Sequence, residues 1–286
     1  MTDRDAAPAL PEQVAGWRVE RRLGAGGLGS VVLARNAAGE PAALKLIDLG
    51  GTDSATQGEL FEREVAAARR LDHPRIVRVL EAGRAGDLGC IAMEFVGGGD
   101  LGQPQLRAQP PSLRQSLRWA ADVAQALAHA HAQGVLHRDI KPANILLEEN
   151  TERAKLADFG LARLADLHGS RTGVLAGTPA YMSPEQLAGG TLDARSDLYS
   201  LGVVLFERLA GRLPHEAASL GALLREVSCT PAPPLERFKP DAPPALSALL
   251  ARLLAKEREH RPADAATLAR ELEALLATLP DEAPGR

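Results

Sequence analysis

The chain has 286 residues, 45% hydrophobic and 24% charged, enough apolar sequence to bury a sizeable core. Its 33 basic residues against 37 acidic ones give a net charge of −4, which argues against nucleic-acid binding. Two cysteines are too few for a disulfide framework and indicate a reducing compartment. Neither a signal peptide nor an apolar run of about 20 residues is found, so no membrane segment is expected. These features predict a cytoplasmic protein of one or two domains.

The first half of the chain favours strands. Residues 1–13, rich in alanine and proline, are predicted to form a disordered tail. Trp17 and the residues after it partly alternate between apolar and charged, and apolar residues at helical spacing predict one helix over 60–71. Short apolar runs bounded by turn residues predict strands at 31–34, 42–47, 76–80 and 90–96.

Three glycines at Gly97–Gly99 mark a change to helical sequence. A capping-box pattern at Ser112–Gln115 opens a helix that ends before Gly134. Later helices are expected at about 197–210, 217–228, 245–255 and 264–279. The predicted organisation is a disordered tail at 1–13, a β-rich N-lobe at 14–96, the end of a hinge at 97–100, a helical C-lobe at 101–279 and a disordered tail at 280–286.

The segment Gly24–Gly29 fits the pattern G-x-G-x-x-G, which alone is weak evidence. Dinucleotide-binding loops share it but open a helix. Here Val31 and its neighbours read as a strand, so the pattern predicts a hairpin with glycines at its tip, whose backbone could approach phosphate groups. A purely structural hairpin is the alternative.

A buried ion pair is predicted between the next strand and the following helix. Lys45 ends an apolar strand, and Glu64 lies on the apolar face of the helix. A carboxylate on a buried face requires a cation, and Lys45 is the natural candidate. A half-exposed Glu64 and a lysine that reaches solvent at a sheet edge are the alternatives.

More specific patterns follow. His137–Asn144 fits H-R-D-[IL]-x-x-x-N, Asp158–Gly160 reads D-F-G, and Ser183–Glu185 stands where an Ala-Pro-Glu triplet is expected. The chain order is therefore glycine loop, Lys45, Glu64, H-R-D…N, D-F-G and S-P-E. Agreement of all six by chance is negligible.

With these motifs the chain resembles the bacterial eukaryotic-type (Hanks-type) protein serine/threonine kinases over about residues 17–279. The resemblance implies an α+β, bilobal protein-kinase fold, with a β-rich N-lobe carrying one helix and a larger helical C-lobe. It also implies an enzyme that transfers the γ-phosphate of ATP to serine and threonine hydroxyls of protein substrates. The implied cofactors are ATP and Mg²⁺, with Mn²⁺ as the alternative metal.

The resemblance assigns roles to the motif residues. Asp139 accepts or aligns the substrate hydroxyl, and Lys141 neutralises the γ-phosphate. Lys45 holds the α- and β-phosphates and is oriented by Glu64. The expected metal ligands are Asn144 and Asp158. The residues expected at the ATP site are Leu23, Gly24, Ala25, Gly26, Gly27, Leu28, Gly29, Ser30, Val31, Ala43, Lys45, Met93, Glu94, Val96 and Leu146.

The resemblance also implies regulation by phosphorylation. Thr172 and Ser170 are the candidate autophosphorylation sites, with exposed, unmodified hydroxyls as the alternative. Arg138 and Arg163 could bind the added phosphate. Thr178 matches the P+1 loop threonine. A homodimer for autophosphorylation in trans is a further expectation.

Two acidic residues are predicted to be structural. Glu185 and Arg261 resemble a buried ion pair, and Asp197 resembles a helix residue that holds the H-R-D backbone.

Two other functions are also considered. A pseudokinase scaffold would require the loss of Lys45 or Asp139, among others, and these are present. A small-molecule kinase is disfavoured by the glycine loop and Lys141. A further possibility is that the chain is part of a longer kinase.

Overall fold

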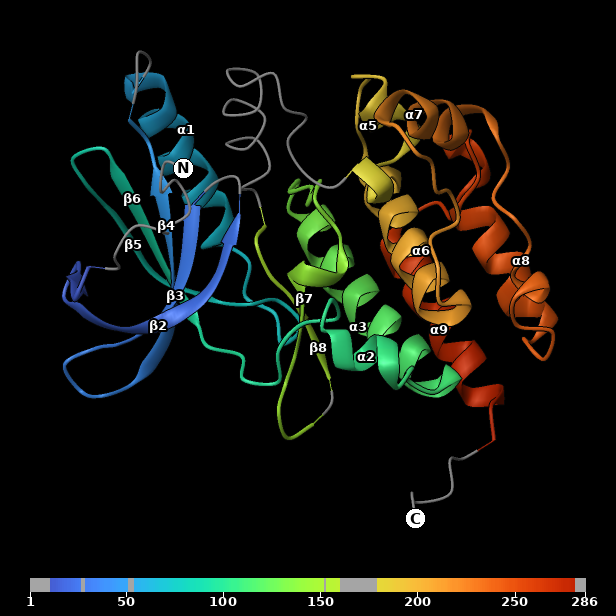
Figure 1. The fold of residues 1–286 in the computed structure, drawn as a ribbon, viewed down its shortest axis with the longest axis horizontal. Coiled ribbons are helices and arrows are strands. Elements are labelled where there is room, and N and C mark those ends of the chain that lie inside the picture. The colour runs from blue at the N-terminus through green and yellow to red at the C-terminus, as the bar shows by residue number, and fades with distance from the viewer. Residues whose placement is uncertain (1–10, 27–28, 51–53, 152, 160–178, 281–286) are drawn as a thin grey trace, which may run out of the picture. The chain divides into compact units, whose positions relative to one another are not determined.

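The computed structural model describes residues 11–26, 29–50, 54–151, 153–159 and 179–280. These residues divide into two compact units, here named the sheet unit (11–70 and 78–95, with the stated gaps) and the helical unit (71–77, 96–159 and 179–280, with the stated gaps). Figure 1 shows the elements of both in chain order. An antiparallel sheet with one helix, followed by a helical region, confirms the predicted α+β class.

The sheet unit is built on six antiparallel strands in the order β1-β2-β3-β4-β6-β5. Strands β1 to β4 follow one another as neighbours, whereas the chain passes through α1 to the edge strand β5 and returns as β6 beside β4. In the β3–β4 turn the Asn36 side chain accepts hydrogen bonds from the backbone amides of Ala38 and Glu40. The elements are β1 (Gln13–Val14), β2 (Trp17–Gly26), β3 (Gly29–Arg35), β4 (Pro41–Asp48), α1 (Ser54–Ala68), β5 (Val79–Ala85) and β6 (Leu88–Glu94).

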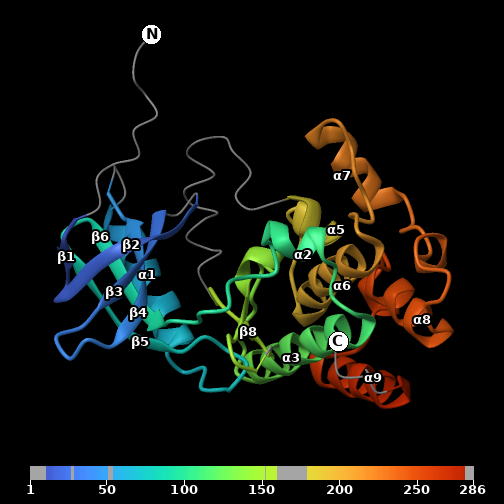
Figure 2. The same ribbon diagram turned by 60° about the horizontal axis from the view of Figure 1, so that its bottom comes forward.

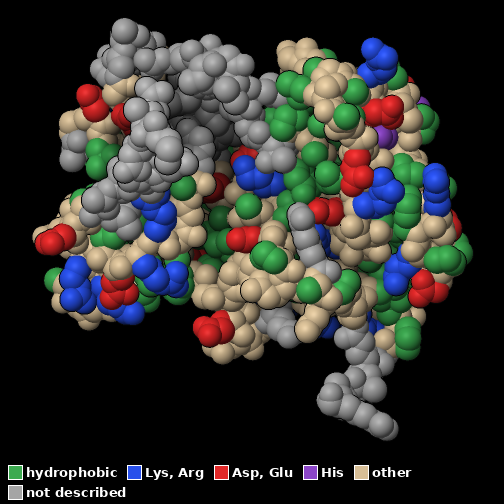
Figure 3. Space-filling model, viewed as in Figure 1, with side chains coloured by type: hydrophobic (Ala, Val, Ile, Leu, Met, Phe, Trp, Pro, Cys, Tyr) green, Lys and Arg blue, Asp and Glu red, His purple; other side chains and the backbone are tan. Residues whose placement is uncertain are grey.

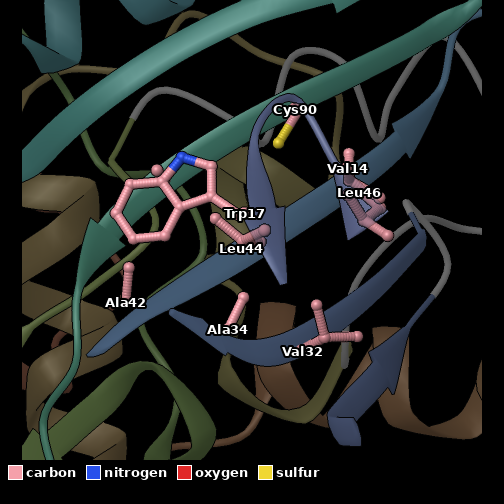
Figure 4. Close-up of a cluster of buried hydrophobic side chains, with 9 residues drawn as sticks. Val14, Trp17, Val32, Ala34, Ala42, Leu44, Leu46 and Cys90 are labelled. Carbon is pink, nitrogen blue, oxygen red and sulfur yellow. The ribbon is translucent and has the colours of Figure 1, made fainter. Parts of the chain in front are cut away.

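The two faces of the sheet are covered differently. On one face Trp17 packs in a buried apolar cluster (Figure 4). Helix α1 lies on the other face of the sheet. Phe61 of this helix packs directly on Gly89 of β6, where an added Cβ would be 2.8 Å from its ring. Alternate residues of a strand share a face, so Ile91 also projects towards the α1 side. The cluster comprises Val14, Trp17, Val32, Ala34, Ala42, Leu44, Leu46, Cys90 and Ala92.

The β1–β2 hairpin begins inside the segment predicted to be a disordered tail. Gln13 pairs with Arg18 and Val14 with Trp17. This pairing places Val14 and Trp17, each 8% exposed, in the apolar cluster, and their burial offsets the cost of ordering the segment. The sheet therefore starts before residue 14.

The turn of this hairpin contains a strained alanine, which yields a stability prediction. Ala15 has φ 47° and Gly16 φ 84°, the positive pair of a type I′ turn. Asparagine tolerates this conformation better than alanine, so Ala15→Asn is expected to raise the free energy of unfolding by about 0.5–1 kcal/mol. Gly16→Ala should lower it by about 1 kcal/mol, although a Cβ there would meet nothing within 4 Å. Chemical denaturation checks both; equal stabilities of Ala15→Asn and the unmodified chain would contradict the turn assignment.

The predicted strand at 76–80 is only partly correct. Strand β5 begins at Val79, whereas Ile76 forms an isolated parallel bridge with Leu156 of the helical unit. The Val77 amide also donates to Leu156 O (3.0 Å), and the Leu156 amide donates to Arg75 O (2.8 Å). These backbone bonds explain why residues 71–77 belong to the helical unit.

The helical unit is organised around α6. Residues 196–208 of this helix are buried, as expected for a helix covered on all sides. Helices α3 and α9 lie side by side (Figures 1 and 2). The elements are α2 (Pro104–Ala108), α3 (Leu113–Ala132), β7 (Ile145–Leu147), β8 (Ala154–Leu156), α5 (Pro184–Leu187), α6 (Ala194–Ala210), α7 (Leu220–Cys229), α8 (Pro244–Leu253) and α9 (Ala265–Thr278).

In the helical unit the helix positions follow the predictions within a few residues, whereas α1 begins at Ser54 and ends at Ala68 and not over the predicted 60–71. Short elements were missed. Ser112 caps α3 by accepting a hydrogen bond from the Gln115 amide (3.0 Å), as the capping pattern predicts. The short helix α2 and the β7–β8 hairpin were not predicted. Pro280, assigned to a disordered tail, is described, and its carbonyl accepts a hydrogen bond from Arg114 (2.9 Å).

One face of the molecule carries side chains of both charges. On the face shown in Figure 3, acidic and basic side chains of the described residues are interspersed. This mixture agrees with the small net charge. Within the described ranges, no helix is long and apolar enough to cross a membrane.

Candidate active site

The centre of the candidate site is the carboxylate of Asp139, on the loop between α3 and β7. Its Oδ2 accepts hydrogen bonds from Lys141 Nζ (2.7 Å) and Asn144 Nδ2 (3.1 Å). Asn144 Nδ2 also donates to the Asp139 carbonyl (2.7 Å). The Asp139 side chain remains 30% exposed. The loop therefore fixes an ionisable oxygen while leaving it accessible to a reactant.

Asp197, at the start of α6, holds this loop by its backbone. Its two oxygens accept hydrogen bonds from the amides of His137 (2.9 Å) and Arg138 (2.8 Å). His131 Nε2 lies 2.8 Å from Asp197 Oδ2. Burial alone would raise the pKa of Asp197, but the bonds from His131 and from the loop amide outweigh it and lower the pKa. Asp197 is therefore ionised, and its carboxylate holds the backbone of the loop at His137 and Arg138.

His137 links the same loop to the strand that follows. It is fully buried; its Nδ1 accepts from the Asp139 amide (3.2 Å) and its Nε2 bonds to Ala157 O (2.7 Å). A carbonyl only accepts, so the proton is assigned to Nε2. Phe159 packs edge-on against the imidazole, 4.7 Å between ring centroids. The histidine thus positions residues on both sides of Asp158.

The β7–β8 hairpin brings Asn144 and Asp158 to the same end of two strands. Asn144 immediately precedes β7, whose first residue pairs with the last residue of β8, and Asp158 follows two residues after β8. The Ala157 amide donates to Asn144 O (2.9 Å). Asp158 has φ 65° and Arg138 φ 67°. Such left-handed non-glycine residues are strained and cluster at functional sites.

In the sheet unit, Lys45 and Glu64 lie on the same side of the sheet. Lys45 pairs with Ile91, so its side chain projects from the face covered by α1. Glu64 follows Phe61 of α1 by three residues, about one turn. Both side chains are buried, at 8% and 7% exposure. A buried lysine and a buried glutamate under one helix fit the predicted pair, which remains a prediction.

The described residues of the glycine pattern lie at the ends of two paired strands, as the predicted hairpin requires. Gly24 pairs with Val31, and Gly26 pairs with Gly29, so the chain turns from strand to strand. At Gly29, φ is 138° and a Cβ would lie 1.8 Å from the Leu46 carbonyl oxygen. Only glycine fits this approach to β4. Gly29 is therefore required by the packing of the strands, independently of any role in nucleotide binding.

The residues predicted to contact adenine are distributed over the two units. In the sheet unit, Met93 is 7% exposed and Leu23 37% exposed. Residues Val31, Ala43 and Glu94 are partly exposed, and Ala43 pairs with Met93. In the helical unit, Val96 and Leu146 are partly exposed.

Glu185 and Arg261 form a bidentate ion pair in the helical unit. Arg261 Nη1 and Nη2 lie 2.7 and 2.9 Å from the two carboxylate oxygens. Arg261 also donates to three backbone carbonyls, and Ser196 Oγ donates to Glu185 (2.6 Å). Burial would raise the pKa of Glu185, but the bonds from Arg261 and Ser196 lower it to about 2.

Several predicted site residues lie outside the described residues. They are Gly27, Leu28, Gly160, Arg163, Ser170, Thr172 and Thr178.

Two contacts at the site were not foreseen. His131 bonds to Asp197, and Gln186 Nε2 donates to Arg138 O (2.7 Å). The residues of each contact are far apart in the sequence, and neither His131 nor Gln186 belongs to one of the motifs. Only the packing of α3 and α5 near the loop reveals them.

Comparison with known proteins identifies the class. The family described as protein kinase domain matches residues 17–272, so the chain belongs to the protein kinase family. The predicted resemblance to bacterial serine/threonine kinases and the kinase fold are confirmed.

Three relatives illustrate this. Over 272 residues (91% of this chain, 50% of the relative) the chain is 39% identical to the serine/threonine-protein kinase pkn3 of Myxococcus xanthus. Over 255 residues (86% of this chain, 43% of the relative) it is 42% identical to the serine/threonine-protein kinase PknJ of Mycobacterium tuberculosis. Over 259 residues (87% and 41%) it is 39% identical to PknB of Mycolicibacterium smegmatis. The chain therefore spans half or less of the length of these relatives.

Proposed function

We propose that the chain is an ATP-dependent protein serine/threonine kinase. The observation that carries this proposal is the Asp139 carboxylate, held by Lys141 and Asn144 on a loop that Asp197 fixes. Phosphoryl transfer depends on positioning and charge neutralisation. The hydrogen bonds of this loop position Asp139, and Lys141 supplies a positive charge beside it.

In the proposed reaction Asp139 acts on the substrate hydroxyl. The hydroxyl oxygen attacks the γ-phosphorus, the bond to the β-phosphate bridging oxygen breaks, and ADP leaves. The hydroxyl proton passes to Asp139, or Asp139 aligns the hydroxyl for in-line attack. Lys141, now paired with Asp139, places a positive charge where the γ-phosphate would approach.

Asn144 and Asp158 are the proposed ligands of Mg²⁺, with Mn²⁺ as the alternative. Asn144 donates through Nδ2 to Asp139, which leaves its Oδ1, a ligand atom that hard cations prefer. Within the described residues no three histidine, cysteine or carboxylate side chains are grouped as a metal site. Phosphate oxygens and water would therefore complete the coordination, as is usual for Mg²⁺. When bound, the ion would neutralise phosphate charge.

The sheet unit is proposed to hold the nucleotide phosphates. Amides of the glycine hairpin would cover them, and Lys45 would bind the α- and β-phosphates while Glu64 orients it. The burial of Lys45 and Glu64 supports this, since a desolvated charge requires a partner. The apolar residues Leu23, Val31 and Ala43, with others predicted above, would contact adenine.

Transfer of labelled phosphate tests the function. The chain is incubated with ATP labelled at the γ-phosphate, Mg²⁺ and a generic basic protein. Label on serine or threonine of the protein is expected. Its absence, with the nucleotide bound, would contradict the proposal and favour a pseudokinase scaffold. Transfer to an aminoglycoside or choline but to no protein would indicate a small-molecule kinase.

We also propose that the kinase phosphorylates its own loop, at Thr172 or Ser170, with Arg138 and Arg163 binding the phosphate. Support comes from Arg138, whose backbone is fixed next to Asp139 by Asp197 and Gln186. A homodimer would allow transfer in trans, and Thr178 would contact the substrate hydroxyl region. The proposed location is the cytoplasm.

Mass spectrometry of the purified chain after incubation with ATP checks the autophosphorylation. Phosphate on residues 161–178 is expected, mainly on Thr172. Asp139→Asn is the matched control and should carry none. An unmodified segment in an enzyme that phosphorylates other proteins would contradict this proposal while leaving the kinase activity standing.

A further inference from the structure

Most lysines of the chain lie next to a carboxylate. The chain contains Lys45, Lys141, Lys155, Lys239 and Lys256. Lys45 is buried in the sheet. Ion pairs join Lys141 to Asp139 (2.7 Å), Lys155 to Glu148 (3.6 Å) and Lys239 to Asp241 (3.7 Å). A carboxylate favours the ammonium form, which is not nucleophilic.

Lys256, just after α8, has an imidazole partner instead. Its Nζ lies 3.0 Å from Nε2 of His215, which follows α6 and is 5% exposed. An ammonium only donates, so His215 accepts at Nε2 and carries its proton on Nδ1. Across the described residues, no carboxylate oxygen lies within ion-pair distance of Lys256 Nζ. The amine is therefore held by a neutral acceptor.

Burial and the neighbouring positive charges lower the pKa of both side chains, so the imidazole is neutral and the lysine loses its proton more readily. Burial, followed by the positive charge of Arg261, lowers the pKa of Lys256 to about 8, although Cys229, Glu226 and Glu257 act in the opposite direction. Burial and the charge of Lys256 lower the pKa of His215 to about 4, opposed by Glu226. At pH 7 about one Lys256 amine in ten is then unprotonated, against about one in 2,500 for an ordinary lysine.

We propose that Lys256 is a nucleophilic lysine that is modified by acyl thioesters. The unprotonated amine attacks the thioester carbonyl, forming a C–N bond while the C–S bond breaks. The proton lost by nitrogen passes to the departing thiolate, so the products are an amide and a free thiol. No oxidant or reductant is needed.

The Lys256 side chain is accessible to a reagent in solution, and it lies on a segment that contacts Arg261. The side chain is only partly buried, and the neighbouring Cys229 at the end of α7 is exposed. The carbonyl of Lys256 accepts a hydrogen bond from Arg261 Nη2 (2.9 Å). The amide would therefore form on the segment that holds the Glu185–Arg261 pair, and it would remove the positive charge of Lys256.

The test measures acetylation of each lysine in the full chain by acetyl-CoA between about pH 6 and pH 10. Peptide mass spectrometry gives the rate at each site, with Lys239 as the matched surface control. Lys256 should react at least about tenfold faster than Lys239 at pH 8, since its larger unprotonated fraction outweighs a lower intrinsic nucleophilicity. Its rate should level off above a midpoint near pH 8. Equal rates at the two lysines, or a Lys256 rate still rising at pH 10, would overturn the proposal.

Two variants at His215 test the role of the neutral partner. His215→Glu places a carboxylate opposite Lys256 and should slow its acetylation at pH 8 by about tenfold or more. His215→Gln retains a neutral acceptor and should change the rate by less than about threefold. Thermal unfolding verifies that both variants fold. If both react as fast as the unmodified chain, His215 is not the controlling partner and the proposal fails. The pH profile of the unmodified chain decides the matter even if His215→Glu does not fold.

Discussion

Replacement of Asp139 by asparagine is expected to lower kcat for phosphate transfer by about 10²–10⁴-fold. Both hydrogen bonds to the side chain, from Lys141 and Asn144, are accepted by the same oxygen, Oδ2. The amide oxygen of asparagine can take that place and retain both bonds. The variant therefore loses the negative charge and the proton acceptor while retaining the loop, and KM for ATP should change little.

The matched control is Asp241→Asn, which removes the same charge from the same unit. Asp241 is 79% exposed and, among the described residues, forms an ion pair with Lys239, so its loss should leave kcat unchanged. Initial rates at saturating ATP and Mg²⁺ give the comparison. Undiminished transfer by Asp139→Asn would exclude Asp139 as the group that acts on the hydroxyl. A matching loss in Asp241→Asn would indicate a general effect of charge.

Local sequence patterns predicted the glycine hairpin and most helix positions, whereas the bonds that Lys141 and Asn144 make to Asp139 were not among the predictions. Lys141 and Asn144 reach Asp139 from two and five positions further along the chain. A strand-to-strand reading of the glycine segment followed from the apolar residues after Gly29, and the β2–β3 hairpin has this form. Helix positions followed from apolar periodicity and from caps such as Ser112.

Contacts between distant residues were predicted from the resemblance or were missed, apart from the Lys45–Glu64 pair, which the apolar patterns predicted and which stays a prediction. Asp197 was assigned to the loop by family likeness, whereas its bond to His131 had no signal, since the two positions are 66 residues apart. The β1–β2 hairpin was missed because Gln13 and Val14 form too short a strand for a periodic pattern. Burial of Val14 and Trp17 in the apolar cluster of the sheet stabilises this hairpin, and the alanine- and proline-rich composition of residues 1–13 gives no sign of it.

Breaking the Glu185–Arg261 pair is expected to have the largest effect on stability. Arg261→Ala leaves Glu185, 15% exposed, without its bidentate partner and should lower the free energy of unfolding by about 3–5 kcal/mol. The double variant Glu185→Leu/Arg261→Met should lose less than the sum of the two single changes, because no unpaired charge remains. Chemical denaturation at neutral pH measures all four proteins. Additive losses would contradict direct coupling of the two side chains.

The same pair predicts a dependence on pH. Since the pKa of Glu185 is lowered in the folded chain, from 4.5 to about 2, ionised Glu185 stabilises the fold. The contribution, about 3 kcal/mol, is fully present above about pH 4.5 and is lost as the pH falls towards 2. Other lowered carboxyls, such as Asp197, add to this loss, so the comparison is with Glu185→Gln. The difference in unfolding free energy between this variant and the unmodified chain should be largest at neutral pH and shrink steadily on acidification below pH 4.5. A difference that is independent of pH would show that Glu185 stabilises the fold by packing and not by its charge.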